Sequence, residues 1–175
     1  MDQVLISAEQ IEQRVRGLSR EIAADFAERE LTVVAILNGT VLFLADLIRN
    51  LSVPLRLDFI GVSSYGFGTK SGELVFTKEL RLDVRERDVL LIDDILDTGK
   101  TLSRVLTKVR QLGARNVRTC VLLSKDAPRV EDVKADYVGF SIPNLFVVGY
   151  GLDFAERYRN LPFIGVLKPE LTRES

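Results

Sequence analysis

Short apolar runs alternate with segments of helical periodicity along this chain, and this alternation constrains the fold more than any other feature. Residues 31–37 form a β-branched apolar run that ends at an Asn-Gly pair, and helical periodicity follows over 41–51. The same order recurs in an apolar run over 89–92, a helical pattern over 102–112 and a buried run over 116–123. The alternation predicts an α/β fold with a parallel sheet covered by helices on both faces. Ligands of such sheets bind beyond the carboxyl ends of the strands, so we expect functional residues there.

The remaining segments carry weaker signals. Ser7 and Gln10 have the spacing of a capping box, and the apolar residues after them predict an amphipathic helix over 8–29. A strand is predicted over 54–63, and the polar, glycine-rich segment 63–72 is predicted to be a mobile loop. Three apolar runs near the C-terminus have no convincing helix between them, which favours a small antiparallel or irregular flap: 136–142, 146–150 and 163–167.

The composition excludes several classes of function. The 175 residues contain no linker and no internal repeat, which predicts a single domain over 1–175. With 24 Lys and Arg against 25 Asp and Glu, the net charge is -1, so no global field attracts nucleic acid or an anionic membrane. The chain has no His, which excludes Ser-His and Cys-His nucleophile pairs and imidazole metal ligands. The single Cys120 is expected in the core, and the lack of a leader pattern or a long apolar run favours a cytoplasmic location.

One segment, residues 89–101, places three carboxylates and a Thr-Gly-Lys-Thr turn between a buried strand and the start of a helix. The free backbone N–H groups of that helix start and the hydroxyls of Thr98 and Thr101 can surround a phosphate monoester, and Gly99 lets the backbone approach closely. An ordinary capped helix is the alternative. A nucleotide-binding P-loop would need Gly at position 94, where this chain has Asp, and this argues against an ATPase.

Two adjacent acids in this segment, Asp93 and Asp94, would be costly to bury side by side unless a cation or hydroxyl groups engaged them. They therefore suggest a site for a ribose diol and a divalent cation. Two solvated turn residues are the alternative.

The apolar strand followed by Asp93-Asp94-x-x-x-Thr98-Gly99 resembles the phosphoribosyl-pyrophosphate (PRPP) signature of type I phosphoribosyltransferases. Residues 96–101 are similar to the branch that uses 6-oxopurines, and most of 136–162 is similar to hypoxanthine phosphoribosyltransferases. The resemblance covers about residues 31–169. It implies that family's fold, with a hood built from the N-terminal segment and about 136–175. It also implies Mg2+-dependent transfer of the 5-phosphoribosyl group from PRPP to hypoxanthine, and to guanine, in purine salvage.

The resemblance also implies roles for residues that would bind PRPP. Asp97 is the implied general acid or base beside the imidazole ring of the purine, with N-capping of the helix as the alternative. Ribose and 5-phosphate contacts are implied for Asp93, Asp94, Asp97, Thr98, Gly99, Lys100 and Thr101. The Lys100 side chain is expected to be solvated. Pyrophosphate contacts are implied for Asn38, Gly39 and Arg159. Asn38 departs from the Lys that the family commonly has, and we expect activity to survive if backbone amides bind the pyrophosphate.

The purine site and the metal site follow from the same resemblance. Purine contacts are implied for Lys125, Phe146, Val147 and Asp153. Lys125 would donate to the 6-oxo group and Phe146 would stack on the ring, and the alternatives are a surface Lys and a plain core Phe. Mg2+ ligands are implied at Asp93, Asp94 and Asp153, and the alternative for Asp153 and Arg159 is a surface pair. Ser64 and Tyr65 would belong to a lid that excludes water from the site.

Two other hypotheses stay open. A regulatory protein with this fold that binds RNA would need a basic face and usually lacks an acid at position 97, so Asp97, Lys125 and the balanced charge argue against it. An enzyme that prefers xanthine or guanine is not separated by sequence, because the relevant contacts are backbone groups around Val147 and Asp153. The resemblance further implies a homodimer or homotetramer with residues 40–51 and the pyrophosphate-loop region at the interface. The balanced charge and the lack of a long apolar run predict no nucleic-acid or membrane partner.

Overall fold

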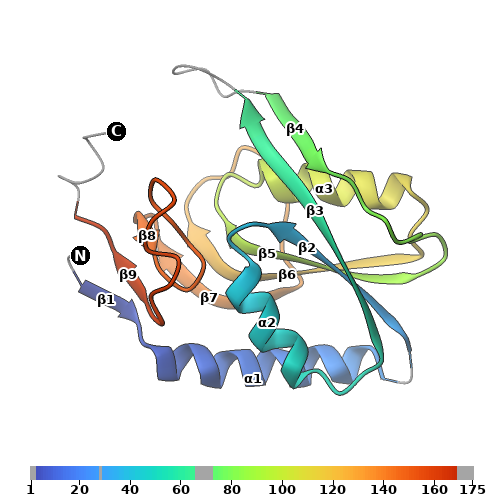
Figure 1. Cartoon of the computed structure of the whole chain (residues 1–175), viewed down its shortest axis with the longest axis horizontal. Coiled ribbons are helices and arrows are strands. Elements are labelled where there is room, and N and C mark those ends of the chain that lie inside the picture. Colours follow the sequence, from blue (N-terminus) through green and yellow to red (C-terminus); the bar gives the residue numbers. More distant parts are fainter. Residues whose placement is uncertain (1–2, 28, 66–72, 169–175) are drawn as a thin grey trace.

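The computed structural model describes residues 3–27, 29–65 and 73–168. Six strands form the central sheet in the order β4-β3-β2-β5-β6-β7 (Figure 1). Five of them are parallel: β2 (Leu31–Leu37), β3 (Leu55–Tyr65), β5 (Asp88–Leu96), β6 (Asn116–Asp126) and β7 (Tyr137–Pro143). At one edge, β4 (Glu73–Lys78) pairs antiparallel with β3.

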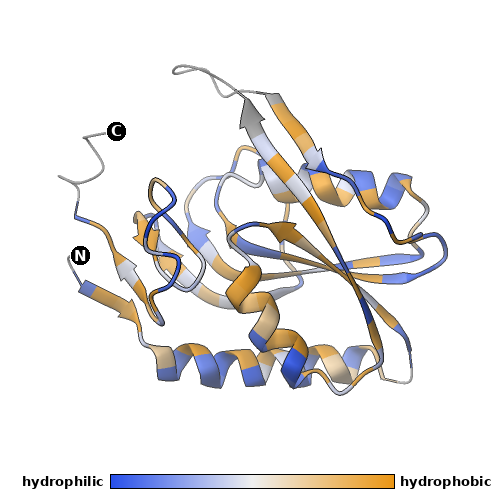
Figure 2. Ribbon diagram, viewed as in Figure 1, coloured by the Kyte–Doolittle hydropathy of each residue, from blue (hydrophilic) through white to orange (hydrophobic). Residues whose placement is uncertain are grey.

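Helices cover both faces of this sheet, which confirms the prediction from the alternating pattern. One face carries α1 (Ala8–Asp25) and α2 (Val41–Asn50), and the other carries α3 (Lys100–Gln111). In β5, Leu90 and Ile92 pack with α1 and α2, whereas Val89 and Leu91 pack with α3. Successive side chains of a strand point to opposite faces, so a strand covered on both sides must be apolar throughout. Figure 2 shows this apolar character along most of the inner strands.

Helix α1 begins where the capping box predicted. The Ser7 hydroxyl accepts a hydrogen bond from the N–H of Gln10, and the Gln10 side chain accepts one from the N–H of Ser7. The predicted end at residue 29 was wrong, because the helix ends at Asp25 and Phe26 is its C-cap. Phe26 continues the apolar spacing and is buried, but it lies in the turn that leads to β2.

A second, antiparallel sheet has the order β1-β9-β8 and lies beside the central sheet (Figure 1). Its strands are β1 (Gln3–Ile6), β9 (Ile164–Val166) and β8 (Val147–Val148). The predicted flap is therefore present, and the N-terminal strand takes part in it. The strands predicted over 146–150 and 163–167 are shorter than expected.

The assignment of residues 136–142 to the flap was wrong, because β7 pairs parallel with β6 at the edge of the central sheet. The connection 127–136, all of which the structure describes, contains no helix, so the usual signal of a crossover is missing from the sequence. Gly139 permits the close pairing, since a Cβ there would lie 2.4 Å from the carbonyl oxygen of Leu122. Arg14 of α1 donates to the carbonyl oxygens of Val138 and Gly139 and ties the helix to this strand.

The segment predicted as a mobile loop, 63–72, begins inside a strand. β3 continues through Ser63 to Tyr65, and Ser64 and Tyr65 pair with Leu74 and Glu73 of β4. Residues 66–72 lie outside the described residues, so the mobility of the loop stays a prediction.

Candidate active site

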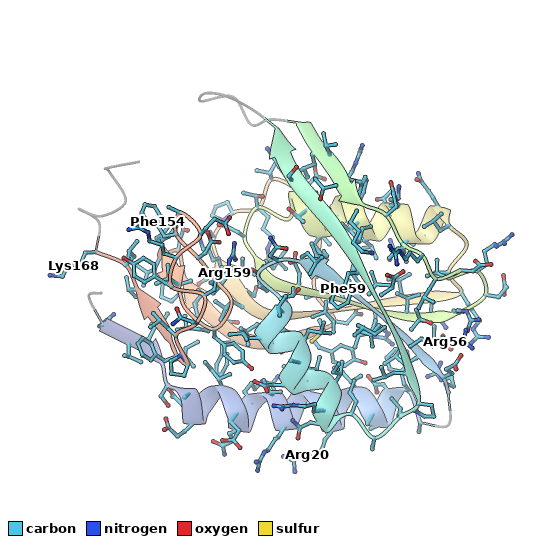
Figure 3. All side chains as sticks on the ribbon, in the orientation of Figure 1. Arg20, Arg56, Phe59, Phe154, Arg159 and Lys168 are labelled. Carbon is cyan, nitrogen blue, oxygen red and sulfur yellow. The ribbon has the colours of Figure 1, made fainter. Side chains whose placement is uncertain are left out.

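Four segments that are distant in sequence meet at the carboxyl end of the central strands and line a cavity of about 330 Å³, and one of them is β3, which contributes Val62. The turn after β2 contributes Asn38 and Gly39, the end of β5 and the start of α3 contribute 93–99 and Thr101, and the loop after β8 contributes Asp153 and Arg159. Figure 3 shows Arg159 in that loop, between the small sheet and the central sheet. The cavity lies at the edge of the sheet where the sequence predicted ligand binding.

The paired acids Asp93 and Asp94 lie inside a strand, because β5 continues to Leu96. The alternative of two solvated turn residues is therefore wrong, and Asp93 is only 6% exposed. Burial raises the pKa of Asp93 well above its usual range, and the charge of Asp94 raises it further. Burial also raises the pKa of Asp94. Within the described ranges neither carboxylate has an ion-pair partner, so both keep the capacity to bind a cation or hydroxyl groups.

Gly39 lies against Asp94 so closely that a side chain would displace the carboxylate. A Cβ at Gly39 would be 1.6 Å from Asp94 Oδ2. On the other side, Gly151 has a φ of +100°, and a Cβ there would be 2.0 Å from the carbonyl oxygen of Gly39. Asn38 is exposed and lines the cavity, after a cis Leu37–Asn38 peptide bond. The three loops thus meet through glycine backbone.

The first turn of α3 has no side-chain cap. Its N-cap is Gly99, whose φ of +83° is in the left-handed region that glycine favours. Both alternatives, an ordinary capped helix and N-capping by Asp97, are therefore wrong. Among the described contacts, the Thr98 hydroxyl accepts one long hydrogen bond from this turn, at 3.5 Å from the backbone N–H of Lys100. Lys100 is partly exposed. The helix end therefore keeps free N–H groups and the positive end of its dipole for an anion.

The segment after β6 forms hydrogen bonds to this turn, and the sequence analysis did not predict these contacts. The carbonyl oxygen of Thr98 accepts hydrogen bonds from the N–H groups of Val130 and Glu131 at 3.0 and 3.1 Å. The connection that holds these residues has no periodic pattern that could have identified them. Ile95 was missed as well, although an apolar residue between the acids was a signal, and it is partly exposed in the cavity lining.

Asp97 and Lys125 form an ion pair, with 2.7 Å between Oδ2 and Nζ. The Lys125 side chain is 12% exposed, so the alternative of a surface Lys is wrong. Lys125 lies near the end of β6, where it also lines a second hollow of about 570 Å³ with Arg129 and Asn144. The ion pair therefore joins the two hollows, because Asp97 lines the first and Lys125 the second.

Asp153 and Arg159 also form an ion pair, with 3.0 Å between their charged atoms. Both side chains are 27% exposed and both line the first cavity, so a pair confined to the surface is the wrong description. Arg159 donates to the carbonyl oxygen of Gly151, and the Asp153 carboxylate accepts from the N–H of Glu156. The loop thus holds both side chains in place.

The predicted purine residues are not all gathered around the first cavity. Phe146 is 45% exposed and meets the ring of Phe154 edge to face at 5.6 Å, so it is not a core residue. Val147 is buried in β8. The lining of the first cavity, within the described residues, includes Asp153 but not Lys125, Phe146 or Val147. The side chains of Ser64 and Tyr65 lie outside what the structure describes.

Comparison with known proteins identifies the family. A sequence model of the phosphoribosyl transferase domain matches residues 5–155. Over 170 residues the chain is 46% identical to the hypoxanthine-guanine phosphoribosyltransferase of Bacillus subtilis, an alignment that covers 97% of this chain and 94% of that protein. The chain belongs to the phosphoribosyltransferase family, in its hypoxanthine-guanine branch.

Two further comparisons extend this result. The chain is 47% identical over 175 residues to the bifunctional protein TilS/HprT of Listeria innocua, but it spans only 27% of the length of that relative. A crystal structure of a hypoxanthine phosphoribosyltransferase from Staphylococcus aureus superposes with a TM-score of 0.93 at 41% identity, covering 98% of this chain and 94% of that one. The predicted type I phosphoribosyltransferase fold is confirmed. Among the described helices, none has both the length and the apolar character needed to span a membrane.

Proposed function

We propose that this chain transfers the 5-phosphoribosyl group of PRPP to hypoxanthine or guanine and releases pyrophosphate. One observation carries the proposal: an uncapped helix N-terminus, the buried Asp93 with the partly buried Asp94, and the carboxylate of Asp97 line the same cavity. The helix end suits a phosphate, the paired acids suit hydroxyl groups and a cation, and Asp97 suits a proton transfer. PRPP combined with a purine presents all of these groups at once.

The 5-phosphate occupies the turn from Asp97 to Thr101 in this proposal. The N–H groups at the start of α3 supply the donors, and the hydroxyls of Thr98 and Thr101 complete them. Lys100 contributes less, because the backbone supplies most of the donors. The carboxylates of Asp93 and Asp94 accept hydrogen bonds from the ribose hydroxyls.

Pyrophosphate lies between Arg159 and the turn of Asn38 and Gly39. The Arg159 guanidinium is oriented by Asp153 and Gly151, and its other terminal nitrogen pairs with the exposed carboxylate of Glu156 at 3.0 Å. A phosphate group that replaces Glu156 can bind the oriented guanidinium with little further loss of freedom. Backbone amides of the Asn38 turn supply the remaining donors, which is why we expect activity without a Lys there.

In the transfer step, the bond between the anomeric carbon and the pyrophosphate oxygen breaks and its electron pair leaves with pyrophosphate. Purine N9 forms the new bond, and the proton that the purine loses from N7 passes to the Asp97 carboxylate. Lys125 donates to the 6-oxo group, Phe146 stacks on the ring, and backbone groups of Val147 and Asp153 contact its edge. A lid that includes Ser64 and Tyr65 excludes water from the oxocarbenium-like centre.

Mg2+ fits the donors of this site. Within residues 3–27, 29–65 and 73–168 no three metal-binding side chains form a complete cage, and Mg2+ typically takes one or two carboxylates together with substrate oxygens. Asp93, Asp94 and Asp153 are the residues that would hold it, and the bound ion would neutralise part of the pyrophosphate charge. The cytoplasmic location and the homodimer or homotetramer stay predictions.

An ultraviolet assay with PRPP and Mg2+ tests the proposal. Hypoxanthine, guanine, xanthine and adenine are offered in turn, with a chelator as the control. We expect turnover of hypoxanthine and guanine but not adenine, and loss of turnover with the chelator. Turnover of xanthine above the other bases would favour the xanthine-preferring alternative. No turnover of any base would contradict the proposal and favour the regulatory RNA-binding alternative.

A further inference from the structure

Asp97 differs from the other acids of the cavity in how its carboxylate is held. The carboxylates of Asp93 and Asp94 accept backbone N–H bonds from the next residue, at 3.0 and 2.8 Å, and that of Asp153 accepts the N–H of Glu156 at 2.9 Å. Asp97 accepts a hydrogen bond only from Lys125, among the residues that the structure describes. The Asp97 side chain is 46% exposed, and within the described protein one side chain orients its carboxylate.

The pairing of two neighbouring strands places Lys125 at this position. Leu96, the last residue of β5, lies opposite Ser124 of β6 in parallel register. Asp97, just beyond the end of β5, and Lys125 of β6 each follow one residue later. The Ser124 hydroxyl also accepts a hydrogen bond from Arg129 at 2.8 Å. With only 12% of its side chain exposed, Lys125 has little freedom to move away from Asp97.

We propose that Lys125 is a positioning residue for the Asp97 carboxylate, in addition to the purine contact proposed above, on which this inference rests. An ammonium group carries three N–H donors, so Lys125 can hold Asp97 and donate to a 6-oxo group at the same time. The N7 and 6-oxo positions lie side by side on one edge of a 6-oxopurine. Lys125 Nζ and Asp97 Oδ2, which are 2.7 Å apart, suit that edge: Lys125 donates to the 6-oxo oxygen and Asp97 accepts from the N7–H.

A double-mutant cycle on kcat separates positioning from purine recognition. Lys125→Met and Asp97→Ala are made singly and together, and kcat is measured with saturating PRPP and hypoxanthine. We expect Lys125→Met to lower kcat about tenfold in the wild-type background, because a misplaced proton acceptor slows the transfer. In the Asp97→Ala background the same substitution should change kcat less than about twofold, since the group that it positions is gone.

Unsubstituted purine removes the 6-oxo contact from the comparison. Lys125→Met should still lower kcat with this base, and Lys125→Arg, which keeps a donor to Asp97, should restore part of the loss. Lys134→Met is the matched control, because it removes the same charge from an exposed position. Thermal melting of each variant verifies that it folds.

The outcomes distinguish this inference from the proposed function. A wild-type chain without turnover of any base overturns both. An active wild type in which Lys125→Met raises only KM for hypoxanthine, or in which the losses in kcat multiply across the cycle, overturns the positioning role and leaves the proposed function intact.

Discussion

Strand β5 has a buried aspartate near each end, and the pKa values of the two are shifted in opposite directions. Asp88, at the amino end, is 0% exposed. Burial acts to raise the pKa of Asp88, but hydrogen bonds from Arg115 and Asn116 and the charge of Arg29 outweigh it, and the pKa is lowered. At the carboxyl end, burial leaves the pKa of Asp93 raised, with no described cation in contact.

This contrast separates carboxylates that stabilise the fold from carboxylates that are available to a ligand. The protein supplies every partner that Asp88 needs, so this residue stabilises the native state. The burial of Asp93 beside the partly buried Asp94 has a cost that their described partners offset only in part, because the pKa of both stays raised, which is typical of functional sites. Substitutions at the two ends should therefore separate activity from stability.

The largest effect is expected for Asp97→Ala, just beyond the carboxyl end of β5. Turnover should fall by at least about 100-fold, because a general acid or base is lost, while PRPP binding stays largely intact. Steady-state kinetics and a PRPP titration measure both quantities. Near-normal turnover would show that Asp97 is not the general acid or base.

Gly39→Ala tests the same end from the side of β2. The new methyl group would be 1.6 Å from Asp94 Oδ2, so the carboxylate must move, and we expect kcat/KM for PRPP to fall by about 10-fold or more.

Gly17→Ala is the matched glycine control. Gly17 lies inside α1, and a Cβ there meets only the flexible Arg14 side chain at 3.4 Å. This variant should keep its activity and gain about 0.5–1 kcal/mol of stability. Equal activity of the two Ala variants would show that the contact between Gly39 and Asp94 does not matter.

A direct comparison of Asp88→Asn with Asp93→Asn could break the contrast between the two ends. Asp88→Asn should lower the free energy of unfolding by about 2 kcal/mol, because Arg115 and Asn116 lose a charged acceptor. Asp93→Asn should leave stability unchanged or raise it by about 1 kcal/mol while activity falls. Urea unfolding of both variants measures this, and equal destabilisation would mean that the two ends are alike.

The pH dependence of stability sharpens the same contrast. The folded pKa of Asp88 is lowered, so its contribution is fully present above the unfolded value of about 3.9 and is lost as the pH falls through the folded pKa. The difference in unfolding free energy between wild type and Asp88→Asn should therefore be constant near neutral pH and shrink below about pH 4. A difference that grew on acidification would contradict the assigned direction.

The smallest effect is expected at the N-termini of α1 and α3, one with a capping box and one without a side-chain cap. Ser7→Ala removes the capping box of α1 and should lower the free energy of unfolding by about 1 kcal/mol without a change in kcat. Gly99→Ala at the uncapped start of α3 should instead lower activity, since a side chain there would meet Val133 at 2.8 Å. Loss of activity in Ser7→Ala would show that α1 also serves the site.

Much of the fold could be predicted because local patterns report it. The apolar runs of β2 and β5 and the capping box of α1 depend on residues close together in sequence, and all three were recognised. β7 was misplaced because its partner strand and its crossover leave no periodic signal, and its pairing depends on a close approach of Gly139 to Leu122.

The alternating α/β architecture and the segment of acids and Thr-Gly-Lys-Thr could be inferred before folding is considered, since both lie in consecutive residues. How these groups are held depends on the packing of distant segments. The Asp97–Lys125 pair joins residues 28 positions apart through the register of two strands, and the contact of Gly39 with Asp94 depends on two loops meeting. Burial, which separates the states of Asp88 and Asp93, is likewise a property of the packed chain and not of the residue.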